Sequence, residues 1–105
     1  MKINIINTTT DSNKIARIIA EDLINKKISP CVQILPKVES TYKWNGKIVC
    51  SKEYFLIIKI IPDHIHECKK HIKKLHNYDN PEIIVTEGEI LLDAYKEWFL
   101  EHSAQ

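Results

Sequence analysis

The segment from Glu53 to Ile61 constrains the fold of this chain more than any other. After its leading glutamate it reads Tyr-Phe-Leu-Ile-Ile-Lys-Ile-Ile, an almost uninterrupted apolar run. Strands with one solvated face alternate polar and apolar residues, whereas strands buried on both faces do not. The segment therefore predicts a central strand, with helices over one face and room for a partner molecule on the other.

A β-hairpin is predicted directly before this strand. Asn45-Gly46 separates two β-prone runs within Tyr42 to Val49. Both central residues of a type I′ turn need positive φ, which Asn and Gly tolerate best. Further upstream, Cys31 to Leu35 predicts a short strand that starts after Pro30 and stops at Pro36.

Helices are predicted on both sides of this β-rich centre. Between positions 15 and 24, isoleucine and leucine recur at three- and four-residue steps, which indicates an amphipathic helix ending near Lys26-Lys27. Pro62 and Asp63 open a second helix, and Ile90 to Leu100 predicts a third. The second helix has an inward apolar stripe made of Ile65, Cys68, Ile72 and Leu75.

Two further strands complete the order of elements. Lys2 to Asn7 predicts the first strand, which a turn of capping residues from Thr8 to Ser12 follows, and Glu82 to Val85 predicts the last. The order β-α-β-β-α-β plus a terminal helix is the split βαβ pattern of ferredoxin-like domains, an α/β (α+β) class with an antiparallel sheet and, here, an extended hairpin. With 105 residues the chain has room for one domain, residues 1–105.

Composition argues against several classes of partner. The 15 basic and 14 acidic residues leave a net charge of +1, and Arg17 is the one arginine, so we expect no nucleic-acid binding. No apolar stretch is long enough for a signal peptide or a membrane span, which predicts a cytoplasmic protein without a membrane partner. The three cysteines are widely spaced without a CxxC pair, so we expect free thiols.

Motifs of common enzyme classes are missing from the sequence. Gly46 and Gly88 are the only glycines, so no glycine-rich phosphate loop exists. No GxSxG nucleophile motif occurs either. We therefore expect that the protein is not an enzyme.

One set of metal-ligand side chains lies on the second predicted helix. His64, Cys68 and His71 are spaced by four and three residues, so one helical face could present all three to copper or zinc. In the alternative interpretation, Cys68 belongs to the apolar stripe and the histidines lie on a solvated face among lysines.

Several motifs in the same order and spacing resemble the CutA family nearly from end to end. They are Cys31 to Pro36, Ser40 to Ile48, Glu53, Leu56 to Lys59, His76 to Tyr78, Pro81 to Ile84, and Tyr95 with Trp98. The resemblance implies a ferredoxin-like protomer, a homotrimer and a role in divalent-cation tolerance, with copper the metal most often named. A trimer would also bury Trp44 and pair the backbone of the hairpin with a neighbouring sheet.

The resemblance also implies a small-ligand cleft between subunits. The matched positions are Cys31, Tyr42, Trp44, Glu53, Lys59, His76 and Tyr78. A thiol, a carboxylate, an ammonium and an imidazole together could bind an anion or a metal, or transfer protons. In the alternative interpretation, Glu53 and Lys59 form a structural ion pair and Cys31 is a small core residue.

The chain departs from the family at two positions associated with metal binding. The family pattern uses a Cys at the end of the first strand and a His-His pair, whereas this chain has Asn7 and Leu75-His76. We therefore expect only weak Cu(II) binding, through His76 with help from Cys68 or His71. Lys37 also stands where family members commonly have Gly.

The same order of elements leaves an alternative function open, that of a PII-like signalling module. PII-like signalling modules are trimers with the same protomer topology, bind a nucleotide or metabolite and regulate a partner protein. Against this interpretation, the chain is poor in glycine and arginine and has no long loop between its predicted elements.

Overall fold

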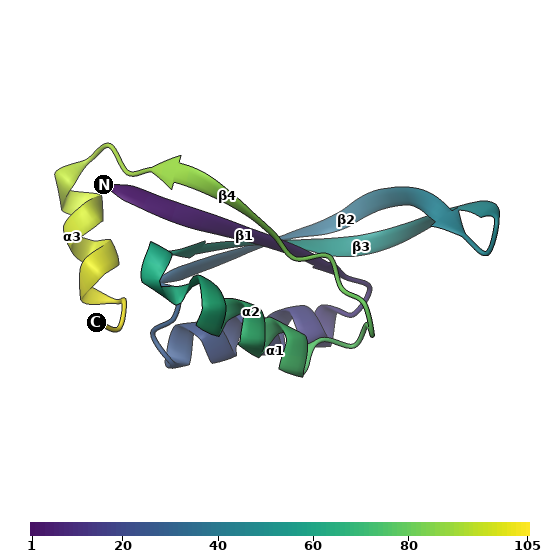
Figure 1. Cartoon of the computed structure of the whole chain (residues 1–105), viewed down its shortest axis with the longest axis horizontal. Coiled ribbons are helices and arrows are strands. Elements are labelled where there is room, and N and C mark those ends of the chain that lie inside the picture. The colour runs from purple at the N-terminus through teal and green to yellow at the C-terminus, as the bar shows by residue number, and fades with distance from the viewer.

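A central strand, β3 (Lys47–Ile60), organises the fold. The computed structural model describes all 105 residues and contains one antiparallel sheet in the order β2-β3-β1-β4 (Figure 1). The other strands are β1 (Lys2–Thr10), β2 (Cys31–Trp44) and β4 (Ile84–Glu89). The predicted ferredoxin-like order of elements is confirmed.

Helices α1 (Asn13–Asn25) and α2 (Ile65–Leu75) cover one face of this sheet, and a 3₁₀ turn, Pro62–His64, leads into α2 (Figure 1). Alternate residues of β3 point toward these helices and form the core. Leu56, Ile58 and Ile60 are fully buried there together with Leu23 of α1 and Ile72 of α2. The predicted central strand is therefore confirmed, with its apolar residues divided between two faces.

The opposite face of the sheet is covered by neither α1 nor α2, and we call it the open face. Phe55 and Ile57 of β3 lie there half-buried. Helix α3 (Asp93–Glu101) packs at one end of the sheet, where Phe99 is buried against Ile3 and Ile61 (Figure 1).

Strand β1 is longer than predicted. Thr8 to Thr10, which we expected in a turn, pair with Leu56 to Tyr54 of β3. Threonine is β-branched and favours strands, so the pairing with β3 outweighs its capping tendency. Ser12 alone caps α1, and its hydroxyl accepts a hydrogen bond of 3.1 Å from the N–H of Ile15.

Strand β2 does not stop at Pro36 as predicted, because a β-bulge carries it past the proline. Leu35 pairs with Phe55 and Val38 with Glu53, so β2 has one extra residue between these pairs. Proline is tolerated there because β2 lies at the sheet edge. Lys37, inside the bulge, has a φ of 60°, a left-handed conformation that favours glycine.

The bulge reverses which residues of β2 face the open side. Before the bulge, odd-numbered residues such as Leu35 share a face with Phe55; after it, the even-numbered Tyr42 and Trp44 share that face. The two strands then meet at Asn45 and Gly46, with φ values of 51° and 77°. This confirms the predicted turn, and the hairpin extends well beyond the helices along the 48 Å length of the molecule (Figure 1).

The C-terminal elements begin later than predicted. The last strand was expected at Glu82 to Val85, but β4 pairs Ile84 to Glu89 with β1. The third helix starts at Asp93 instead of Ile90. Pairing with β1 sets the bounds of β4, and the local sequence carries little information about that long-range pairing.

Helix α1 ends as predicted. The N–H of Ile28 bonds to the carbonyl of Leu23 at 3.0 Å, and Lys27 between them has a φ of 55°. This is a Schellman motif, and its two apolar residues are packed in the core. None of the helices combines the length and the apolar character that crossing a bilayer would require.

We predict that Lys37→Gly stabilises the protein by about 0.5–1 kcal/mol, because glycine relieves the cost of positive φ. Urea unfolding at one fixed protein concentration measures the change. Lys52→Gly, a strand position on β3 opposite Glu39, is the matched control and should destabilise by a similar amount. Equal effects of the two variants would contradict the role of the bulge.

Candidate functional site

Four of the seven predicted cleft residues line one cavity of about 940 Å³ on the open face. Tyr42 and Trp44 come from β2, Glu53 from β3, and Tyr78 from the segment after α2. The remaining lining residues are Thr9, Ser40, Thr41, Lys43, Val49, Asp79, Asn80 and Glu82. Sequence reasoning missed the acidic residues among these, although their closeness to Tyr78 in the chain was a usable signal.

Glu53 and Tyr78 form the polar centre of this cleft. The Glu53 side chain is only 6% exposed, and the Tyr78 hydroxyl donates a hydrogen bond of 2.6 Å to its Oε2. A buried carboxylate without such a donor would be costly. Burial and the neighbouring Glu53 both raise the pKa of Tyr78. The phenol therefore stays protonated and can donate its hydrogen bond to the Glu53 carboxylate.

His76 fixes the position of Tyr78 through hydrogen bonds and ring packing. Its Nδ1 accepts a hydrogen bond of 3.0 Å from the backbone N–H of Tyr78, so the proton of the neutral ring sits on Nε2. That Nε2 donates to the carbonyl oxygen of Thr9 at 2.9 Å. The two rings also pack together, with centroids 4.9 Å apart. Both ring nitrogens are therefore occupied within the chain.

The environment favours the neutral form of His76. Desolvation lowers its pKa, whereas the Thr9 hydrogen bond and the charges of Glu53 and Asp11 raise it, and the lowering prevails. His76 thus positions the loop that bears Tyr78 and does not act as a free base.

Cys31 and Lys59 lie far from the other cleft residues. They pair with each other across β2 and β3, and Lys59 is six positions from Glu53, about 20 Å along an extended strand. Lys59 lines a second hollow of about 360 Å³ with Ile3, Ile5 and Tyr95. A single chain therefore brings four of the seven predicted residues into one cavity, and His76 contacts one of these four, Tyr78, without lining the cavity. The predicted alternative of a Glu53–Lys59 ion pair is not formed.

The three positions of the family metal pattern do not fit a copper centre in this chain. The Asn7 side-chain amide donates to the carbonyl of Leu56 at 3.3 Å. Leu75 packs against the core, and His76 has no free nitrogen. No group of three or more His, Cys, Asp or Glu side chains is placed to hold a metal ion.

The predicted metal face of α2 is not formed either. Cys68 is completely buried in the core, and burial raises the pKa of its thiol to about 12, which keeps it protonated. Nδ1 of His71 lies 2.8 Å from Oδ2 of Asp22, and Nδ1 of His64 lies 3.0 Å from the carbonyl oxygen of Ile28. The structure favours the interpretation of Cys68 as part of the apolar stripe.

We predict that His76 makes stability fall on acidification. Its folded pKa lies below the ordinary value of 6.5, so its contribution is complete above that pH and is lost as the pH falls through the lowered pKa. His76→Gln, which keeps a donor for Thr9, should reduce the loss in urea midpoint between neutral and mildly acidic pH. The exposed His66→Gln on α2 is the control, and an unchanged pH dependence in His76→Gln would refute the assignment.

Known proteins resemble the chain in sequence. It matches the family described as CutA1 divalent ion tolerance protein over residues 4–102. The divalent-cation tolerance protein CutA of Thermus thermophilus is 33% identical over 98 residues, which cover 90% of this chain and 92% of that protein. The chloroplastic protein CutA of Arabidopsis thaliana is 32% identical over 97 residues, and these cover 90% of this chain but only 52% of the plant protein.

Solved structures agree with the sequence comparisons. CutA1 from Oryza sativa has a TM-score of 0.92 at 30% identity, covering 99% of this chain and 94% of that one. A structure described as the periplasmic divalent cation tolerance protein CutA of Archaeoglobus fulgidus has a TM-score of 0.89 at 32% identity, covering 97% and 98%. Because the names of relatives include chloroplastic and periplasmic, the cytoplasmic location of this chain stays a prediction. The chain belongs to the CutA1 divalent ion tolerance protein family.

Proposed function

We propose that the chain is a cytoplasmic homotrimer that acts in the response to divalent cations by binding a small ligand in clefts between its subunits. The proposal rests on the separation of the predicted cleft residues into two groups at opposite ends of one sheet face. Within one chain, Tyr42, Trp44, Glu53 and Tyr78 share a cavity, whereas Cys31 and Lys59 lie at the other end of the same sheet face. A second copy that contributes its Cys31 and Lys59 would complete the set.

The exposed apolar surface supports association between copies. Trp44 and Ile48 of the hairpin are 66% and 75% exposed, and Leu91 and Leu92 at the opposite end of the molecule are 84% and 72% exposed. A contact between two different ends is heterologous, and it closes into a ring when the rotation between copies allows. Such a ring would also cover the free edges of β2 and β4.

The chemistry of the cleft favours binding over catalysis. Glu53 is hydrogen-bonded to Tyr78, and both nitrogens of His76 are occupied. The cavity is lined by the aromatic residues Tyr42, Trp44 and Tyr78 and by carboxylates, and no serine or cysteine that lines it is hydrogen-bonded to a base. We therefore assign the protein no enzymatic activity.

For copper we propose weak binding only. His76 must give up its hydrogen bond to Thr9 before its Nε2 can bind a metal, which costs about 1 kcal/mol. Cys68 is too deeply buried to help, and His71 is held by Asp22.

We predict a solution mass about three times the 12.3 kDa of the chain, measured by light scattering. Trp44→Glu should weaken the assembly, because it places a charge on the exposed apolar face of the hairpin. Lys70→Glu, at an exposed position on α2 away from the hairpin and the cleft, is the control for added negative charge and should keep the trimer. A monomeric wild-type protein at micromolar concentration would contradict the proposal.

We predict that titration with Cu(II) shows weak binding that His76→Ala reduces about tenfold, the effect of losing ~1.4 kcal/mol. His66→Ala, on the exposed face of α2, controls for surface imidazoles. If His76→Ala binds Cu(II) like the wild type, His76 has no part in copper binding.

A further inference from the structure

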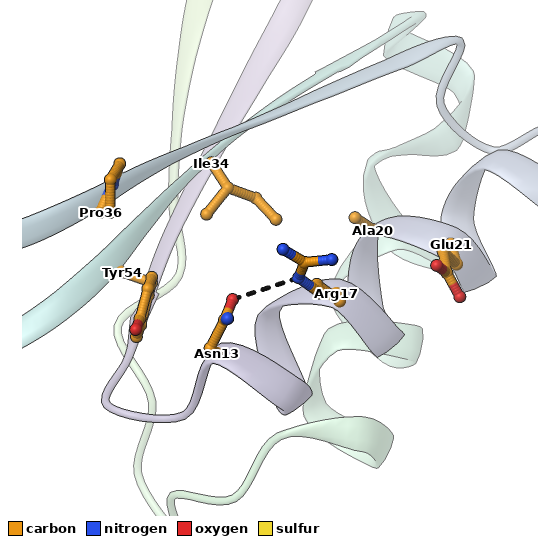
Figure 2. A pocket seen from close by; sticks show the side chains of 7 residues that line it. All are labelled: Asn13, Arg17, Ala20, Glu21, Ile34, Pro36 and Tyr54. Carbon is orange, nitrogen blue, oxygen red and sulfur yellow. Dashed lines mark hydrogen bonds between the residues drawn. The ribbon is translucent and has the colours of Figure 1, made fainter.

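A second groove lies on the helix-covered side of the sheet, away from the cleft described above. It runs between α1 and the edge strand β2 and has a volume of about 510 Å³, within the size range of small-ligand sites (Figure 2). Its lining residues are Asn13, Arg17, Ala20, Glu21, Ile34, Pro36 and Tyr54. Ile34 and Pro36 lie in the Cys31–Pro36 stretch that resembles the family, but the resemblance implies no ligand role for them, and none of the groove residues lines the proposed cleft.

The groove results from a regular pattern on α1. Asn13, Arg17, Ala20 and Glu21 occupy positions i, i+4, i+7 and i+8, so they lie along one side of the helix. The short side chain of Ala20 leaves space between the helix and the sheet. Ile34, Pro36 and Tyr54 supply an apolar and aromatic wall on the strand side, as Figure 2 shows.

Arg17 is the only arginine of the chain, and its guanidinium points into this space (Figure 2). Its Nε donates to the side-chain oxygen of Asn13 at 3.4 Å, which orients the group. The terminal nitrogens have no partner in the chain, because every ion pair in the structure involves Asp22 or Glu67. Glu21, one turn along the helix, does not neutralise Arg17.

We propose that this groove binds a small monocarboxylate with an aromatic or aliphatic body, whose carboxylate pairs with the terminal nitrogens of Arg17. A planar guanidinium with two free nitrogens matches a carboxylate in bidentate geometry. The body of the ligand would lie against Ile34, Pro36 and the Tyr54 ring. Glu21 adds a negative charge to the same stripe and therefore disfavours a dianion such as a phosphate monoester.

The test is a titration of the full-length ¹⁵N-labelled protein with 3-phenylpropionate, followed by amide chemical shifts. We expect saturable shifts at Asn13, Arg17, Ile34 and Tyr54. Three comparison compounds separate the contributions: 3-phenylpropanol lacks the charge, acetate lacks the body, and phenyl phosphate is a dianion. Each should bind more weakly than 3-phenylpropionate.

Arg17→Gln should weaken 3-phenylpropionate binding about tenfold or more, as expected for loss of a charge-assisted hydrogen bond. Lys14→Gln, an exposed cation on the same helix outside the groove, should leave affinity unchanged. Ala20→Met, which fills the groove without touching the charge, should also abolish binding. No saturable shifts, shifts confined to the Tyr42–Tyr78 cleft, or equal affinities of wild type and Arg17→Gln would each overturn the proposal.

Discussion

Pairing of β3 with both of its neighbours is the interaction on which the rest of this structure depends. The strand lies between β2 and β1, and its alternate side chains serve two different surfaces. Leu56, Ile58 and Ile60 anchor the helices, while Phe55 and Ile57 line the open face. Because the strand is apolar on both faces, packing of the helices on one face leaves Phe55 and Ile57 on the other face partly exposed to water.

The bulge in β2 places the aromatic side chains of the hairpin on the face of the sheet that carries the candidate cleft. One extra residue at Pro36–Lys37 reverses the alternation of β2, so that Tyr42 and Trp44 share a face with Glu53. Without it, the two aromatic side chains would point to the other side of the hairpin. A strained φ of 60° at Lys37 accompanies this arrangement.

A chain of hydrogen bonds then connects the cleft to the sheet. Glu53 accepts from Tyr78, the backbone of Tyr78 donates to His76, and His76 donates to the carbonyl of Thr9. Each member satisfies a polar group that burial would otherwise leave without a partner. The residue that most resembles a copper ligand, His76, is therefore a structural link in this network of hydrogen bonds.

Periodicity and turn chemistry in the sequence determined the order of elements, the central strand and the Asn45-Gly46 turn, and the family resemblance pointed to four of the residues that line the cleft. These features are local, since a strand's apolar run or a type I′ turn depends on neighbouring residues.

Tertiary structure alone decided that Thr8–Thr10 belong to β1, that β2 passes Pro36, and that β4 starts at Ile84, because pairing with distant strands sets those limits. Tertiary structure also decided which candidate ligands are available to bind. Cys68 is buried, His76 is hydrogen-bonded on both nitrogens, and Lys59 is about 20 Å from Glu53. Residue type and spacing indicate which chemistry is available, but burial, orientation and distance across the sheet arise only when segments far apart in the chain are packed together.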